Sequence, residues 1–244
     1  MLRLATIGLS ALLIASGVAV VVEHEFGSTQ PAISLGTTEL PPEVAAAASP
    51  VPRSATPSAA PTAVAVPEQS GKPVELIIPF ASSHHPQGLT ARITADPLTA
   101  TGSLFVPHDP RDLSWASQDA APGSGRGTAI VTGHVNYVIG GTLVHGALAD
   151  LAEYATNNIG QTFTVVLADQ RRLTYQVSAG TQYNKDQLAA QPQLREKLYD
   201  QTSTFGTTGA ARSGRLLLVS CGGAFDNATG NYQDNIFLYA LPLG

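Results

Sequence analysis

The sequence predicts a mainly β fold, a closed or nearly closed β-barrel with a few short helices. Residues 73–244 contain about eight short runs rich in leucine, β-branched and aromatic residues, bounded by glycine, proline or polar residues, which is typical of strands. Only two stretches show the one-sided apolar spacing of a helix. Many strands with few connecting helices favour a barrel.

The strands follow one another along this part of the chain. Pro79 and Pro107 each end the run before them, because proline donates no hydrogen bond to a ladder. The segment Ala168-Asp169-Gln170-Arg171 predicts a hairpin turn between two long strands. The expected strands are Val74–Ile78, Leu89–Thr94, Leu104–Val106, Thr128–His134, Thr162–Leu167, Leu173–Tyr183, Leu216–Cys221 and Asn235–Leu241.

Two helices are expected as connections between strands. Leu143–Tyr154 has apolar residues at 144, 147, 148 and 151, a stripe at helical spacing. Asp186–Asp200 predicts a second helix, which Pro192 either interrupts or starts.

The N-terminus predicts a membrane anchor. Arg3 is followed by 19 residues without a charge, Leu4–Val22, and then by acidic residues. At about 1.5 Å per residue this run forms about 30 Å of helix, enough to span a bilayer. The positive charge before the run favours an N-terminus that stays inside. We expect residues 1–22 to be an uncleaved signal-anchor, with a cleaved signal peptide as the competing interpretation.

Composition divides the rest of the chain in two. Residues 23–72 hold eight of the 17 prolines and ten alanines, and bury too little apolar surface to offset their ordering entropy. They predict an extracellular linker. Residues 73–244 predict one domain with ten Lys/Arg against 13 Asp/Glu, a net charge of −3. Since no basic run is interleaved with aromatics, we expect no nucleic-acid partner.

The lone cysteine, Cys221, and His134 occupy matching places. Each ends an apolar run and stands beside a glycine, so each is expected at a strand end, where a rigid sheet passes into a loop. A thiolate is a strong nucleophile, and a nearby histidine can take its proton and later protonate a leaving amine. If the two strands are neighbours, both ends open into one groove suited to acyl transfer.

Other interpretations of reactive residues stay open. A lone cysteine in an exported protein is either a reactive thiol or a small buried hydrophobe. His84, His85 and His108 lack the spacing of metal ligands, so we expect no metal and no cofactor. Asp226 and Asp234 flank the Cys221 loop and are expected to bond its amides.

Three segments together resemble the sortase family. They are Thr132–Asn136 (TGHVN), Val219–Asp226 (VSCGGAFD) and Gly230–Asn235 (GNYQDN). The likeness covers about residues 73–244, is closest to the class F group of actinobacteria, and agrees with the anchor and linker. It implies an eight-stranded β-barrel transpeptidase outside a Gram-positive type cell membrane, held by a single pass through residues 4–22.

The resemblance also implies roles for individual residues. Cys221 would attack a carbonyl of an LPxTG-like sorting signal and form a thioester, while His134 transfers protons. An amine of a cell-wall precursor or of another protein would resolve the thioester, with water as a slow substitute. Ser220 stands where the family usually has threonine, and its hydroxyl is expected to support substrate or oxyanion contacts.

One position departs from the family pattern. Sortases carry an arginine near the start of the last strand, where this chain has Gln233, which donates a neutral hydrogen bond but lacks the charge. One hypothesis is that Gln233, helped by Asn235, does a weaker version of that work. A second is that another arginine reaches in. The arginines nearest in sequence to the motifs are Arg126, Arg212 and Arg215.

Two rival functions remain at this stage. The first is a sortase-fold module with little activity, which binds peptides or cell-wall components. The second is a different cysteine acyl hydrolase of the envelope.

Overall fold

The computed structural model describes residues 33–37, 70–124, 127–199 and 214–243. The strands are β1 (Ile33–Thr37), β2 (Pro73–Ile78), β3 (Leu89–Asp96), β4 (Leu113–Ala116), β5 (Thr128–Gly133), β6 (Asn136–Ile139), β7 (Thr142–His145), β8 (Thr162–Leu167), β9 (Arg172–Asn184), β10 (Arg215–Asp226) and β11 (Asn231–Leu243). The helices are α1 (Leu151–Asn157), α2 (Lys185–Ala190) and α3 (Pro192–Tyr199).

The predicted anchor, residues 1–22, lies outside the described residues, and so does most of the predicted linker, residues 23–72. Of the helices that the structure describes, none has the length and apolar composition needed to cross a membrane. β1 lies within the linker range and pairs antiparallel with residues 179–182 of β9.

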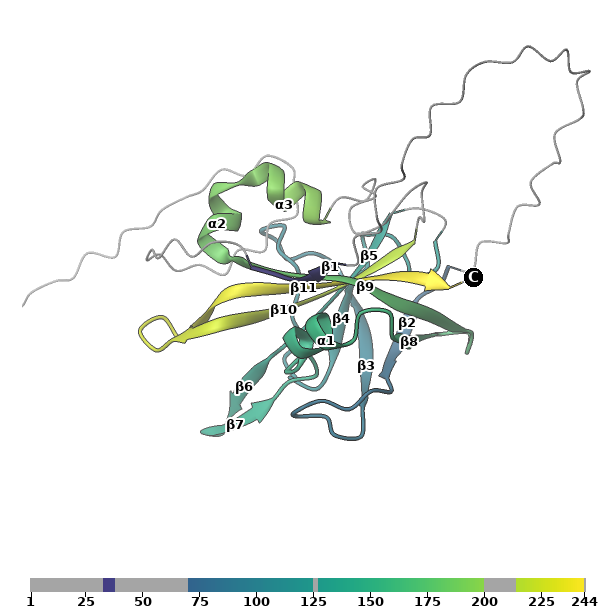
Figure 1. Ribbon diagram of the computed structural model, residues 1–244, viewed down its shortest axis with the longest axis horizontal. Coiled ribbons are helices and arrows are strands. Elements are labelled where there is room, and N and C mark those ends of the chain that lie inside the picture. Colours follow the sequence, from purple (N-terminus) through teal and green to yellow (C-terminus); the bar gives the residue numbers. More distant parts are fainter. Residues whose placement is uncertain (1–32, 38–69, 125–126, 200–213, 244) are drawn as a thin grey trace, which may run out of the picture.

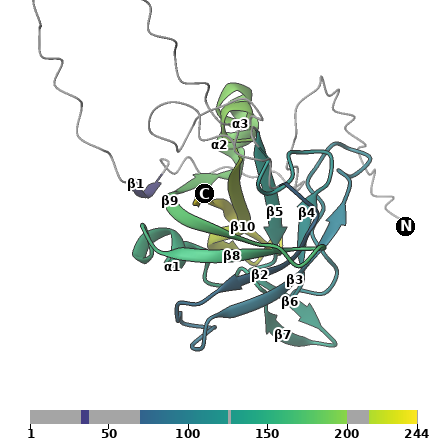
Figure 2. The ribbon, with the colours of Figure 1, turned by 90° about the vertical axis from the view of Figure 1, so that its right-hand side faces the viewer.

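Eight strands close into a barrel, in the order β9-β11-β10-β5-β4-β3-β2-β8, and β8 pairs with β9 to complete the ring (Figures 1 and 2). Closure leaves no long unpaired edge, which is how antiparallel folds avoid edge-to-edge association. Most neighbours are antiparallel, but β5 pairs with β10 in parallel, as β3 does with β4. The prediction of a mainly β, closed barrel is confirmed.

Strand alternation sends the side chains of β10 into two cores. Leu216 and Leu218 belong to the larger core, which the barrel strands enclose with α1. Leu217 and Val219 belong to a second core on the outer face, covered by α2 and α3. Because both faces are buried, the run is continuously apolar in sequence. Cys221 follows Val219 by two residues and therefore shares the outer face.

The strand expected at Leu104–Val106 is wrong. This segment follows an irregular path, and β4 takes its place in the barrel. The carbonyls of Phe105 and Pro107 contact the side chains of Thr132 and His134 instead of a strand ladder. β4 has only four residues, all buried, so it shows no alternation from which it can be predicted.

The helix expected at Leu143–Tyr154 is also largely wrong. Its first part is β7, which forms a hairpin with β6, and α1 begins only at Leu151. Gly140 and Gly141 both adopt positive φ, 57° and 81°, as a two-residue hairpin turn requires. The second expected helix is present as α2 and α3, and Pro192 starts α3.

Candidate active site

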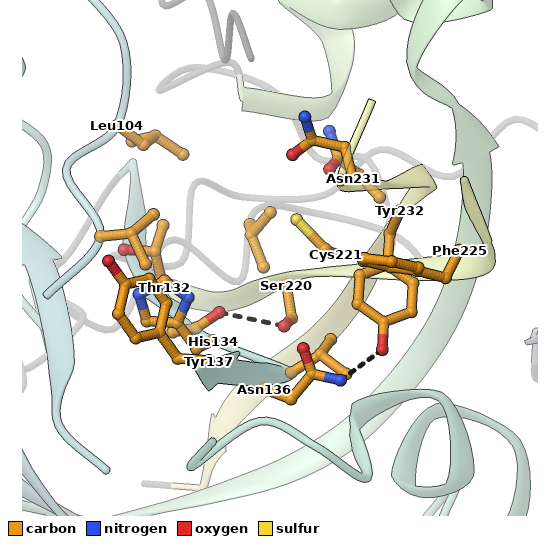
Figure 3. Close-up of a pocket in the computed structure, with 16 residues that line it drawn as sticks. Leu104, Thr132, His134, Asn136, Tyr137, Ser220, Cys221, Phe225, Asn231 and Tyr232 are labelled. Atoms are coloured by element: carbon orange, nitrogen blue, oxygen red, sulfur yellow. Dashed lines mark hydrogen bonds between the residues drawn. The ribbon is translucent and has the colours of Figure 1, made fainter. Parts of the chain in front are cut away.

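His134 directly follows β5, and Cys221 lies in the neighbouring strand β10, two residues past the stretch that pairs in parallel with β5. Because β10 continues to Asp226, the strand end expected at Cys221 is wrong. In the β5–β10 ladder Val219 is opposite Thr132, and Cys221 and His134 each follow two residues later. Parallel pairing brings residues at equivalent register positions side by side. Both residues line one cavity of about 260 Å³ (Figure 3). The structure therefore brings together the two residues that the sequence singled out.

Aromatic side chains form much of the cavity wall. The Tyr137 ring lies 5.0 Å from that of His134, and the Phe225 ring lies edge-on, 5.1 Å from that of Tyr232. Asn136 Nδ2 donates to the Tyr232 hydroxyl at 2.5 Å, which joins β6 to β11 (Figure 3). A mostly apolar concave site with a few polar groups is typical of ligand-binding sites.

His134 is placed to act as a base. Its Nε2 lies 2.9 Å from the Pro107 carbonyl oxygen, which can only accept, so Nε2 carries the proton and Nδ1 has the free lone pair of the neutral ring. Burial lowers the pKa of His134, the Pro107 contact opposes this, and nearby His108 lowers it further. The imidazole is therefore neutral at pH 7 and able to accept a proton.

Cys221 is a free, half-buried thiol on the cavity wall, so it is not merely a small hydrophobe of the core. After it, β10 bulges between Gly222 and Phe225, where the register with β11 shifts. Lys185 Nζ lies 3.5 Å from Cys221 Sγ. Nothing in the sequence singles out Lys185, because it belongs to no motif and follows an ordinary strand.

Ser220 and Asn235, the residues expected to support catalysis, also line the cavity. Ser220 Oγ donates to the Gly133 carbonyl at 3.0 Å, so its hydroxyl proton ties β10 to the end of β5. Asn235 is the register partner of Cys221 in the β10–β11 ladder. The side chains of Asn235 and Cys221 therefore share a face of the sheet.

Gln233 lies on β11 and is half-buried, but it is not one of the residues that line the cavity. Arg215 is wrong as a substitute for the missing arginine. It is 1% exposed at the far end of β10, where it contacts Thr128 and lies over the Tyr239 ring. Six residues of strand place it about 20 Å from Cys221. The other two candidates, Arg126 and Arg212, lie outside the described residues.

Within the described residues, no group of three or more His, Cys, Asp or Glu side chains is arranged to hold a metal ion. Asp226 accepts from the Ala228 amide at 2.8 Å, as expected of a carboxylate that orders this loop. Asp234 instead accepts from the side chains of Gln182 and Asn184.

No family model matches the chain, and neither does any curated protein. Among solved structures, it is similar to sortase C1 of Streptococcus agalactiae, at 14% identity over 70% of this chain and 69% of that chain, with a TM-score of 0.43. It is also similar to sortase E1 of Streptomyces coelicolor, at 12% identity over 71% and 90%, with a TM-score of 0.47. A third is Clostridium perfringens sortase C with the C-terminal cell wall sorting motif, at 10% identity over 73% and 74%, with a TM-score of 0.40.

Proposed function

We propose that this chain is a sortase-type cysteine transpeptidase that cleaves an LPxTG-like sorting signal and transfers it to an amine. The observation that carries the proposal is that Cys221 and His134 line one cavity, each two residues beyond a register pair of the parallel strands β10 and β5. The resemblance of the segments around His134, Cys221 and Tyr232 to sortases, class F above all, supports it.

The first half-reaction forms an acyl-enzyme. The neutral imidazole of His134 accepts the thiol proton, and Cys221 Sγ attacks the carbonyl carbon of the scissile peptide bond. As the tetrahedral intermediate collapses, the C–N bond breaks and His134 returns its proton to the departing amine. The N-terminal fragment of the peptide stays attached to Cys221 as a thioester, and the C-terminal fragment is released.

The second half-reaction transfers the acyl group. An incoming amine, from a cell-wall precursor or another protein, attacks the thioester carbon, and His134 takes the proton that the amine loses. The C–S bond breaks, and the proton returns to Cys221. One amide bond is broken and one is made, so no oxidant or cofactor is required.

The proposed setting is the outer side of the membrane of a Gram-positive type envelope. The uncharged run Leu4–Val22 and the proline-rich residues 23–72 support it, because their composition is that expected of a membrane anchor and a tether.

A binding module with little activity is the second candidate, and one observation favours it. No arginine is among the cavity-lining residues of the described chain, and Gln233 is not among them either. Loss of one charged oxyanion donor costs on the order of 10²–10³ in rate.

The test uses the full-length protein with LPxTG-type peptides, with and without oligoglycine or diaminopimelate-like amines. We expect a ligation product whose formation is abolished in Cys221→Ala and reduced at least about 10²-fold in His134→Asn. His145→Asn is the matched control, since His145 is exposed and does not line the cavity.

Two outcomes contradict the proposal. Cleavage that added amines neither accelerate nor divert identifies an acyl hydrolase. Peptide binding that survives Cys221→Ala, without any product from the unmodified protein, identifies a binding module.

A further inference from the structure

Lys185 places an ammonium group against the cysteine sulfur. Its Nζ lies 3.5 Å from Cys221 Sγ. Lys185 is the first residue of α2 and does not line the cavity, so it reaches the sulfur from the helix that covers the outer face of the barrel. Lys185 therefore contacts the sulfur atom without forming part of the cavity wall.

The turn that carries Lys185 is held by a buried network. Asn184 caps α2 by accepting from the Asp186 amide at 2.9 Å, and its Nδ2 donates to Asp234 at 3.2 Å. Gln182 Nε2 donates to the other oxygen of the same carboxylate at 2.5 Å. Since Asp234 is 4% exposed and lies next to Cys221's strand in the β10–β11 ladder, the network fixes Lys185 relative to Cys221.

Three other titratable groups near the sulfur, His134, Tyr199 and Asp234, do not supply a positive charge. Burial lowers the pKa of His134, so its ring is neutral at pH 7. Tyr199 of α3 is also neutral, because burial raises its pKa well above the ordinary value. Nearby Tyr239 and Cys221 act in the same direction, and Arg195 of α3 opposes them. Asp234 is held by neutral amide groups and carries the opposite sign.

No carboxylate competes for Lys185 in the part of the chain that the structure describes. The ion pairs there join Asp150, Asp112 and Asp169 to other basic side chains. An ammonium next to a sulfur favours the thiolate over the thiol. Among the described residues, Lys185 Nζ therefore contacts the Cys221 sulfur and forms no ion pair with a carboxylate.

We propose that Lys185 is a further catalytic residue, whose ammonium stabilises the Cys221 thiolate from the α2 side. This inference rests on the proposed acyl transfer by Cys221. Lys185 supplies a cation at the nucleophile, in a site whose cavity wall contains no arginine among the described residues. The thiol proton still passes to His134, and Lys185 keeps all three of its protons throughout.

Thiol alkylation tests the inference without a peptide substrate. Cys221 is the chain's one cysteine, so iodoacetamide labelling of the full-length protein reports on this sulfur alone. In Lys185→Met, we expect the pH of half-maximal alkylation to rise by about one unit and the rate at pH 7 to fall about tenfold, since Lys185 is only half-buried. Lys185→Arg keeps the charge and should restore most of the rate.

The matched control is Lys72→Met, which removes an exposed lysine outside the site and should leave the profile unchanged. An unchanged profile in Lys185→Met overturns the inference, and so does a Lys185→Arg profile equal to that of Lys185→Met. The peptide ligation assay is separate, so a protein that shows the expected alkylation profile and forms no ligation product counts against the proposed function alone.

Discussion

At the scale of single residues, the site divides its chemistry among three side chains. In the proposed acyl transfer, Cys221 is the nucleophile, neutral His134 is the base, and Lys185 places a positive charge at the sulfur. None of these groups replaces another, because a buried neutral imidazole cannot stabilise an anion as a cation does.

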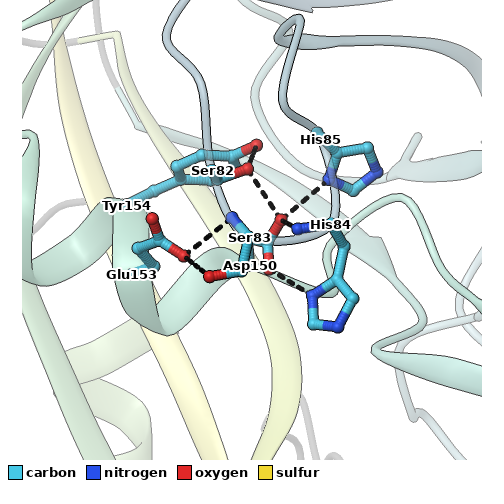
Figure 4. Close-up of polar contacts among 7 residues, drawn as sticks. All are labelled: Ser82, Ser83, His84, His85, Asp150, Glu153 and Tyr154. Carbon is cyan, nitrogen blue, oxygen red and sulfur yellow. Dashed lines mark hydrogen bonds and ion pairs between the residues drawn. The ribbon is translucent and has the colours of Figure 1, made fainter.

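A second residue-scale feature is a carboxylate that holds a loop. Asp150, just before α1, is 4% exposed and lies 2.5 Å from His84 Nδ1 and 3.1 Å from His85 Nδ1 (Figure 4). Ser82 Oγ donates to it at 2.7 Å and contacts Tyr154. The cluster joins the loop after β2 to α1, so we assign it a structural role.

Asp150→Asn should destabilise the fold. Burial opposes ionisation of Asp150, but hydrogen bonds from Ser82, His84 and His85 outweigh it and lower its pKa to about 2. A carboxylate whose pKa is depressed on folding stabilises the protein above its unfolded pKa, and that stability is lost as pH falls through the folded value. We expect a loss of about 2 kcal/mol at pH 7, which shrinks as pH falls from 4 towards 2.

Chemical denaturation at pH 7 and at pH 3 measures this difference. Asp169→Asn is the control, because Asp169 forms an exposed pair with Arg171, and the loss of such a pair should change stability much less. Equal effects of the two substitutions at pH 7 would count against the structural role of Asp150.

At the scale of elements, the bulge after Cys221 shapes the end of β10. Gly223 has φ of 74°, which favours glycine, and a Cβ on it would collide with the Asp234 carboxylate. The same carboxylate holds the turn before Lys185. The bulge and that turn are therefore packed on one buried group.

Gly223→Ala should disturb both stability and Cys221 reactivity. Gly102 is a matched control, because it has a similar φ of 77° but open space around its Cα. We expect Gly102→Ala to cost about 1 kcal/mol and Gly223→Ala about 2–4 kcal/mol, with slower alkylation of Cys221 in the second variant only. Similar stabilities and similar alkylation rates would show that Asp234 moves away without consequence.

The elements also show which sequence patterns were informative. The apolar parts of β5 and β10 are buried on both faces, so their continuous apolar runs predicted both strands and correctly placed His134 at a strand end. The end predicted at Cys221 was wrong, because β10 continues to Asp226 beyond its apolar run. The apolar spacing within Leu143–Tyr154 predicted a helix, but Gly140 and Gly141 form a hairpin turn just before this segment. The positive φ of the two glycines favours the hairpin, so the apolar spacing predicted the wrong element there.

At the scale of the whole molecule, strand order assembles the site. Cys221 and His134 line one cavity because β10 pairs with β5, although their strands are far apart along the chain. Lys185 reaches the sulfur because β9 pairs with β11 and β11 with β10. Local patterns do not specify such pairings, so the sequence predicted the nucleophile and base but neither the cation nor the absence of Gln233 from the cavity wall.

The most direct test of acyl transfer by Cys221 is the intact mass of the full-length protein after mixing with an LPxTG-type peptide and no amine. We predict an adduct with the mass of the N-terminal peptide fragment, attached through a thioester that hydroxylamine removes, and absent in Cys221→Ala. Absence of the adduct, from protein whose single thiol is alkylated readily by iodoacetamide, would contradict it.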